Sequence, residues 1–250
     1  MAARTDLTTD EELGARLLLA RRGQAYFSRK LNELSDDELD GDSLLPGWNR
    51  RFVVAHVGLN ARALTRLTEW ARTGVETPMY ESPTQRNEEI ELAATLPAQA
   101  LRNLSEHAAI HLSVEWRDLR DADWAAEVRT IQGRTVPASE TVWMRTREVW
   151  IHAVDLGNFG SFDDFPEEFL VPLVHDVVAA WGKRRLPEQL PNIELVDVAS
   201  ARAWVTDPAS PRDQVITGSL VDLARWATGR GSGALSTATG EAPPPPPRWL

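Results

Sequence analysis

Apolar positions recur at helical spacing through the first part of the chain. From Asp10 to about Asp37 they repeat every three or four residues behind Thr9, a candidate N-cap, which predicts a long helix. The same period resumes from about Asn49 to Arg72, after the breaker-rich segment DGDSLLPGW. Gly74 is expected to close this second helix, so two long helices are predicted to open the chain.

Two further long helices follow. A short helix is expected in TQRNEEIELAA and a long one from Pro97 to about Leu119. Residues 125–137 carry β-branched side chains around a glycine turn, which is typical of extended structure. Ser139 is a candidate cap for a helix that runs through Leu156 and stops at Gly157. Four long amphipathic helices joined through breakers predict a four-helix bundle.

After the segment GNFGSFDDFP, helical spacing of the apolar residues gives way to a mixture of helix and strand patterns. A helix is predicted from Pro166 to Arg185, but the runs NIELVDV, ARAWVT and DQVITGS are short and β-branched, as strands are. A helix from Ser219 to about Thr228 completes a small α+β unit. The sequence therefore predicts an α plus α/β protein of two domains, a four-helix bundle over residues 1–160 and a smaller α+β domain over residues 161–250.

The last residues, EAPPPPPRWL, favour a semi-rigid polyproline II helix that is packed only by its final residues; a proline-motif ligand is the alternative. Tryptophan occurs ten times in the chain, and we expect most of these side chains to fill the core.

The composition argues against a membrane-spanning, secreted or nucleic-acid-binding protein. The hydrophobic fraction is 42%, yet no long apolar run is present and the segment MAARTDLTTDEELG lacks the features of a signal peptide. We therefore expect a soluble, cytoplasmic protein with no membrane partner. A formal net charge of -10 argues against nucleic acid as the main partner, because phosphate binding relies on clustered Lys and Arg.

The chain contains no cysteine. This excludes disulfides, thiolate metal ligands and an internal thiol nucleophile. Any sulfur chemistry must use a thiol that comes from outside the protein.

The segment TREVWIHAVDLG places Glu148 and His152 four residues apart, on one face of the last helix of the predicted bundle. Such a pair can hold a metal, or it can be a surface ion pair or hydrogen bond. His56 shares a stripe of the second helix with Val53 and Asn60 and should face the interior, where a hydrogen-bonded structural histidine is the alternative. Together the three side chains suit Zn²⁺ and leave a fourth position for water or substrate.

Other histidines and charged residues lie near these positions in the sequence or share their spacing. His107 and His111 also stand four apart, but they have no nearby carboxylate and are expected to be solvent-facing or structural, and His175 has no evident partner. Asp155 is a candidate to orient a ligand imidazole. Two arginines lie beside the pair, Arg145 and Arg147. They could support the ligands or bind phosphate-like groups, but as neighbours on a helix they are expected to form salt bridges.

Four longer stretches of the sequence carry a family resemblance: GWNRRFVVAHV, TGVETPMYESPTQRNEEI, QGRTVPASETVWMRTREVWIHAVDLG and the terminal ATGRGSG with TGEAPPPPPRWL. They are similar to the mycothiol-dependent maleylpyruvate isomerases of the DinB-like metal-binding superfamily. The resemblance covers the chain nearly end to end. In the wider superfamily three histidines usually hold the metal, whereas this chain has Glu148 at one of those positions, as the maleylpyruvate isomerase branch does.

The resemblance implies a site and a reaction. The metal ligands fall on His56, Glu148 and His152, and an arginine that contributes to activity falls on Arg230. Mycothiol would supply the thiolate that adds to maleylpyruvate, and rotation and elimination would then give fumarylpyruvate, as in gentisate degradation. Because the substrate carries two carboxylates, Arg86 is a further candidate to bind it, and a pair with a neighbouring glutamate is its alternative.

Two other functions remain open at this point. The same scaffold can serve a mycothiol-dependent S-transferase that detoxifies electrophiles, because a fold does not fix a function. A metal-stabilised binding module without turnover is the second alternative. For the isomerase, the expected partners are a small-molecule dicarboxylate substrate and a low-molecular-weight thiol, and we expect the protein to be a monomer.

Overall fold

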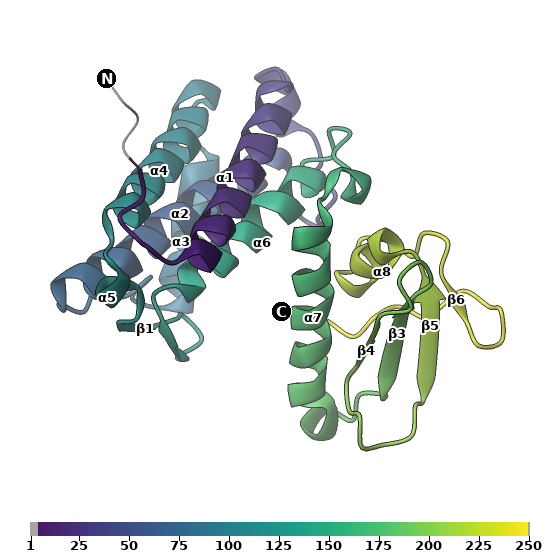
Figure 1. The fold of residues 1–250 in the computed structure, drawn as a ribbon. Helices are drawn as coiled ribbons and strands as arrows, with labels where there is room; N and C mark the ends of the chain where they lie inside the picture. Colours follow the sequence, from purple (N-terminus) through teal and green to yellow (C-terminus); the bar gives the residue numbers. More distant parts are fainter. Residues whose placement is uncertain (1–4, 250) are drawn as a thin grey trace. The chain divides into compact units, whose positions relative to one another are not determined.

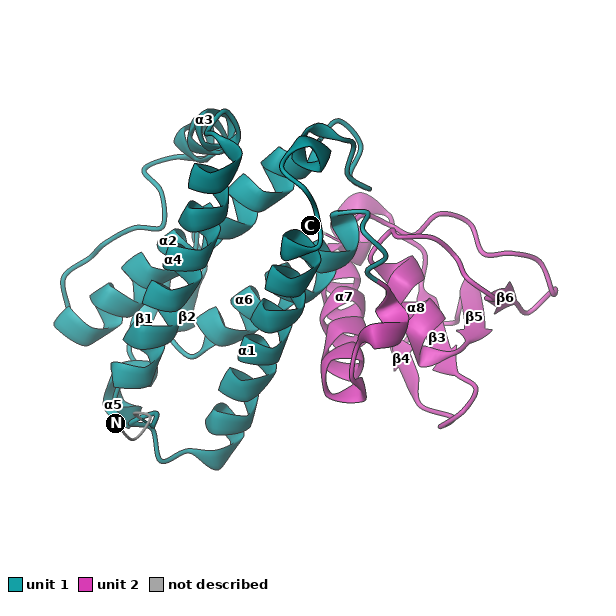
Figure 2. Cartoon of the chain, turned by 90° about the horizontal axis from the view of Figure 1, so that it is seen from above, with its two compact units in different colours: residues 1–160 teal, residues 161–250 magenta. Residues whose placement is uncertain are grey.

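Residues 5–249 of the 250-residue chain are described in a computed structural model. The chain is rich in helix and divides into two compact units, residues 1–160 and residues 161–250 (Figure 2). Each unit is described by itself.

Four long helices form the frame of the first unit. Helix α2 packs against α4 and α6, and α1 packs against α6 (Figure 1). Buried leucines from three of the helices line the space between them, and burying each one stabilises the fold by roughly 1.5–3 kcal/mol. The four helices are α1 (Glu11–Asn32), α2 (Arg50–Thr73), α4 (Ala98–Asp118) and α6 (Glu140–Asp155).

The helix ends follow the sequence signals in part. The Asn49 side chain caps α2 by accepting from the backbone N–H of Phe52, and Gly74 closes the helix in the left-handed conformation, as expected. The prediction of Thr9 as the cap of α1 was wrong. Asp10 caps this helix, because Thr9 is engaged by Asp121 instead.

A further cap differs from its prediction. Ser139 lies at the start of α6 but already has helical backbone angles, and its side chain makes no capping hydrogen bond. The end of this helix agrees with the sequence, because it stops just before Gly157, which adopts a positive φ of 64°.

Shorter elements connect the long helices. Helix α3 (Pro83–Ala94) covers α2, and the expected extended segment forms an antiparallel hairpin of β1 (Glu127–Arg129) and β2 (Thr135–Pro137). Sequence periodicity does not reveal two single-turn elements, η1 (Asp37–Asp40) and α5 (Asp121–Trp124), because they are too short to carry a period.

The second unit combines two helices with a small sheet. The short η2 (Phe162–Asp164) leads into α7 (Glu167–Glu188), and α8 (Leu220–Ala227) packs on α7 (Figure 1). The sheet has the strand order β4-β3-β5-β6, in which β3 runs antiparallel to β4 and parallel to β5. Its strands are β3 (Ile193–Asp197), β4 (Ala203–Val205), β5 (Gln214–Gly218) and β6 (Ser236–Thr237), the last of which was not predicted.

Two tryptophans hold the proline-rich tail. The indole N–H of Trp226 donates to the carbonyl of Pro244 over 2.9 Å, and that of Trp181 donates to the carbonyl of Pro247 over 3.1 Å. The expectation that only the last residues are packed was therefore wrong, because the chain is already held at Pro244. Leu250 lies outside the described residues.

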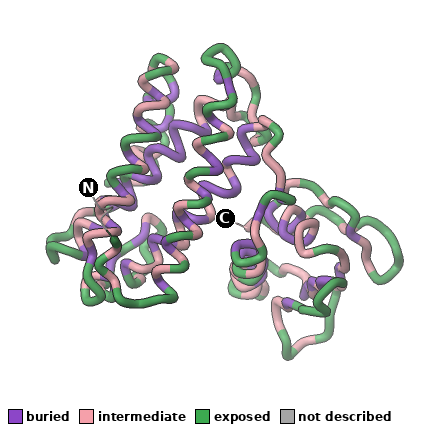
Figure 3. The backbone as a smooth tube through the Cα atoms, turned by 45° about the horizontal axis from the view of Figure 1, so that its top comes forward, coloured by how far each residue is buried: buried purple, intermediate pink, exposed green. Residues whose placement is uncertain are grey.

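Most buried residues belong to helices and strands (Figure 3). Six of the ten tryptophans are buried, in agreement with the expectation that most fill the core: Trp116, Trp124, Trp150, Trp181, Trp204 and Trp226. Among residues 5–249, no helix is both long enough and apolar enough to cross a membrane.

Candidate metal centre

Helices α2 and α6 bring together the three side chains that the sequence marks as candidate ligands. His56 lies on α2 and is only 7% exposed, as its place on the stripe with Val53 and Asn60 predicts. Glu148 and His152 lie one turn apart on α6. One ligand atom from each residue falls within 4.8 Å of the other two. No other such group of acidic or histidine side chains occurs in the described part of the chain.

Both imidazoles meet the same carboxylate oxygen. Nε2 of His56 is 2.8 Å from Oε2 of Glu148, and Nε2 of His152 is 3.1 Å from the same oxygen. The two rings stand nearly perpendicular, with centroids 4.9 Å apart. Two nitrogens and one oxygen therefore converge on one small volume, which is how a three-residue site for a divalent cation is built.

Asp155 orients one of the imidazoles. Its Oδ2 lies 2.8 Å from Nδ1 of His152, and the carboxylate is fully buried. Because a carboxylate accepts, the Nδ1–H of His152 donates to it and Nε2 is turned toward Glu148. The expected contact between Asp155 and a candidate ligand is present.

The three groups shift one another's proton affinities. Burial lowers the pKa of His56 and outweighs the attraction of Glu148, so this ring is neutral. Burial alone would raise the pKa of Glu148, but the two imidazoles hold it well below its usual range. Burial alone would lower the pKa of His152, but its hydrogen bonds to Asp155 and Glu148 outweigh burial and raise the pKa to about 9. The cluster thus holds an ionised carboxylate between two imidazoles.

Arg86 reaches the same cluster from α3. Its Nη2 donates to Nδ1 of His56 over 3.1 Å, and its Nη1 donates to the neighbouring Asn87. The alternative expected for Arg86, a pair with Glu88 or Glu89, is absent among the described contacts. The structure therefore brings this arginine to the candidate ligands.

Arg230 belongs to the second unit. It follows α8 between Gly229 and Gly231, both of which have positive φ. Its backbone N–H donates to Arg225 and its Nη1 donates to the carbonyl of Thr228 over 2.5 Å. The side chain is half-buried.

The remaining histidines are not members of the cluster. His107, His111 and His175 are exposed, in agreement with the expectation of solvent-facing side chains for the first two. The premise that no carboxylate lies near them was wrong for His111, because its Nε2 is 3.7 Å from Oε1 of Glu115, one turn further along the same helix. The expectation of a salt bridge was wrong for Arg145. That side chain is buried and donates to neutral acceptors, because it lies between α6 and α2 and does not reach the helix surface.

Sequence reasoning missed two aromatic residues beside the cluster. The ring of Trp48 stands edge-on to His56 with centroids 5.6 Å apart. Tyr80 is buried close enough for Arg86 and Glu148 to affect its hydroxyl, whose pKa burial raises to about 12. Both residues lie in loops without a periodic pattern, so the sequence carries no signal that places them here.

A helical unit with a histidine–glutamate–histidine cluster between two helices defines a candidate metal-binding enzyme domain. Residues 20–157 match the model of the mycothiol maleylpyruvate isomerase N-terminal domain. The chain therefore belongs to the mycothiol maleylpyruvate isomerase family.

Solved structures resemble the chain over nearly its whole length. One is a crystal structure of the mycothiol-dependent maleylpyruvate isomerase, with 47% identity, a TM-score of 0.89, and coverage of 95% of this chain and 97% of that one. Another is a mutant of that isomerase in which alanine replaces one histidine, with 46% identity and the same TM-score and coverage. The search of curated proteins found no match.

Proposed function

We propose that the protein is a mycothiol-dependent maleylpyruvate isomerase that converts maleylpyruvate to fumarylpyruvate. The observation that carries this proposal is the convergence of His56, Glu148 and His152 in a chain that is 46–47% identical to isomerases of that name. The chain has no cysteine, so the thiol that the reaction needs must be a bound cofactor. A thiolate that adds across the double bond makes it single for as long as it stays attached, which permits rotation.

The donor set fits a zinc ion. Two imidazole nitrogens and one carboxylate oxygen match the ligands of catalytic zinc sites, which keep one position open. Asp155 already fixes the ring of His152 so that Nε2 can ligate. When bound, Zn²⁺ would lower the pKa of a thiol or polarise a carbonyl. His56, Glu148 and His152 would hold it.

Arg86 is the candidate for binding one substrate carboxylate. Its guanidinium stands 3.1 Å from a candidate ligand, and its fork of N–H groups matches a carboxylate in bidentate fashion. The side chain is half-buried, so the interaction would be stronger than one at the open surface.

The two units have separate proposed roles. We assign residues 1–160 to a DinB-like metal-binding four-helix bundle and residues 161–250 to the C-terminal α+β domain of the family. Arg230 would contribute the second guanidinium, since flanking glycines allow the backbone to approach a ligand closely. We expect the enzyme to be a cytoplasmic monomer, and gel filtration of the purified protein tests its oligomeric state.

Product analysis tests the proposed function. Zinc-loaded protein is incubated with maleylpyruvate, with and without mycothiol. The expected result is fumarylpyruvate with full recovery of free mycothiol, and no conversion without the thiol. A stable thioether adduct would establish an S-transferase instead, and no turnover with any thiol would establish a binding module. The zinc content of the same preparation shows whether the protein was loaded.

A further inference from the structure

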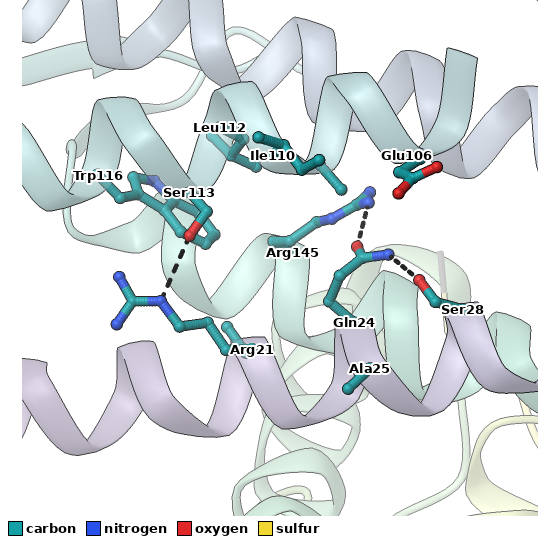
Figure 4. A pocket seen from close by; sticks show the side chains of 12 residues that line it. Arg21, Gln24, Ala25, Ser28, Glu106, Ile110, Leu112, Ser113, Trp116 and Arg145 are labelled. Carbon is teal, nitrogen blue, oxygen red and sulfur yellow. Dashed lines mark hydrogen bonds between the residues drawn. The ribbon is translucent and has the colours of Figure 1, made fainter. Parts of the chain in front are cut away.

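A pocket opens between α1 and α4, and its lining residues include none of the three candidate metal ligands. Its volume is about 330 Å³, at the lower end of the range for small-molecule sites. The close-up in Figure 4 shows Arg145 reaching from α6 into the space between the two helices. The walls are mostly apolar and include Ala20, Ala25, Ala109, Ile110, Leu112 and Trp116.

Arg145 is buried at the base of this pocket, with 2% exposure. Its Nη1 donates to the carbonyl of Val57 over 2.6 Å and to Oδ1 of Asn60 over 2.9 Å. Its Nη2 donates to Oε1 of Gln24 over 2.8 Å. A guanidinium has five N–H donors, so three hydrogen bonds leave two donors for a ligand.

Arg145 makes no ion pair with the described residues. Its three acceptors are uncharged, and within residues 5–249 no carboxylate forms an ion pair with it. Burial lowers the pKa of Arg145 to about 10, more than Glu148 and Tyr80 counteract. Glu148, three residues further along α6, compensates this burial only in part, so an anion that enters the pocket would be bound in part by relieving the remaining cost.

Polar groups beside Arg145 can complete a carboxylate site. Gln24 accepts from Arg145 and donates to Oγ of Ser28 over 3.1 Å, which fixes the orientation of its amide. The Ser28 hydroxyl can itself donate to a ligand oxygen. Glu106 also lines the pocket, and its carboxylate would weaken the binding of an anion by repulsion (Figure 4).

We propose that the pocket between α1 and α4 binds a small organic carboxylate with an apolar or aromatic body, whose carboxylate meets Arg145 and whose body lies against Trp116 and Ile110. The pocket favours such a ligand for two reasons. The guanidinium of Arg145 binds the carboxylate and compensates the loss of its water, and the apolar walls contact the uncharged body. None of His56, Arg86, Glu148 and His152 lines this pocket.

The test compares two probes of the same shape, benzoate and benzamide, by titration calorimetry on the full-length protein. Benzoate is expected to bind and neutral benzamide to bind at least about tenfold more weakly, because each 1.4 kcal/mol of lost charge interaction is tenfold. Glu106→Gln removes a negative charge that repels the carboxylate of benzoate, so it should tighten benzoate binding roughly two- to fivefold.

Two variants locate the bound probe. Ala109→Trp should fill the pocket and abolish benzoate binding, and Ala25→Leu is a milder filling variant if the first does not fold. His152→Ala disrupts the metal centre and should leave benzoate binding unchanged. Failure of benzoate to bind, equal binding of benzamide, or binding lost only with His152→Ala would overturn the proposal.

Discussion

Arg86 donates a hydrogen bond from Nη2 to Nδ1 of His56 over 3.1 Å. A guanidinium has no acceptor, so Nδ1 accepts and the ring proton lies on Nε2, which donates to Glu148. A cation that binds Nε2 needs the lone pair there, and the proton must then lie on Nδ1, facing a donor. Metal binding and the contact with Arg86 therefore exclude each other, so that metal loading would free this guanidinium for a carboxylate.

Zinc should move the proton on His56. In metal-free protein at neutral pH we expect Nε2 to be protonated, and in zinc-loaded protein Nδ1. Nitrogen-15 NMR of the histidine rings distinguishes the two tautomers, and the exposed His107 serves as an internal control that should not respond. An unchanged tautomer on zinc loading would contradict the exclusion argued above.

Arg86→Lys should raise the KM for maleylpyruvate about tenfold, because a lysine retains the charge but loses the bidentate geometry. Steady-state kinetics at saturating mycothiol measure the effect. The matched control is Arg134→Lys, at an exposed position in the hairpin turn, which should leave KM unchanged. An equal KM for the Arg86 variant and the unaltered enzyme would remove this residue from substrate binding.

His152→Ala should abolish zinc binding and turnover while the helices remain folded. The cavity it creates is small, and the leucine core between the helices is untouched, so the melting temperature should change by only a few degrees. Metal analysis, activity and circular dichroism are measured on the same sample. His107→Ala is the matched control, and loss of the fold in the His152 variant would indicate a structural metal instead.

Asp155→Asn should weaken zinc binding by roughly 10–100-fold, the usual effect of removing the partner of a metal-bound histidine. Without the carboxylate, the ring of His152 no longer has a fixed tautomer. Competition with a chelator measures the affinity. Asp118→Asn, at a surface ion pair with Arg117, should leave it unchanged. Unaltered affinity in the Asp155 variant would show that the hydrogen bond plays no part in ligation.

The three candidate metal ligands could be predicted from the sequence. The four-residue step predicts that Glu148 and His152 share a face, and the apolar stripe turns His56 inward, because both follow from helical geometry alone. The contact between Arg86 and His56 could not be predicted from the sequence. It depends on how α3 lies on α2, which no local pattern encodes. The buried setting of Arg145 escaped prediction for the same reason.

Caps were less predictable than helix faces. Thr9 and Asp10 are both good capping residues, and the choice between them was decided by Asp121, more than a hundred residues away, which binds Thr9. Local preferences of this kind are worth about 1 kcal/mol, so a single tertiary hydrogen bond can outweigh them.

Acid should reduce the stabilising effect of Asp197. Burial raises the pKa of this carboxyl, but hydrogen bonds from Ser200 and the backbone N–H of Ala199 outweigh it and leave the pKa below its ordinary value of 3.8. A depressed pKa stabilises the folded state above the unfolded value, and this stabilisation is lost as pH falls through the folded value. Asp197→Asn should therefore cost roughly 1 kcal/mol at pH 7 and progressively less toward pH 3.

Urea unfolding of both proteins at a series of pH values measures this difference in the free energy of unfolding. A gap between them that stays constant from pH 7 to pH 3 would show that the charge of Asp197 contributes nothing.

The hydrogen bonds from Trp226 to Pro244 and from Trp181 to Pro247 have a consequence for biosynthesis. Two buried indoles of the second unit find their acceptors only in the last ten residues of the 250-residue chain. On the ribosome, residues 1–160 can fold as soon as they emerge, because domains generally fold in order of synthesis. The second unit can satisfy both indoles only after Pro244 and Pro247 have left the ribosome, so its interior is completed later than that of the first unit.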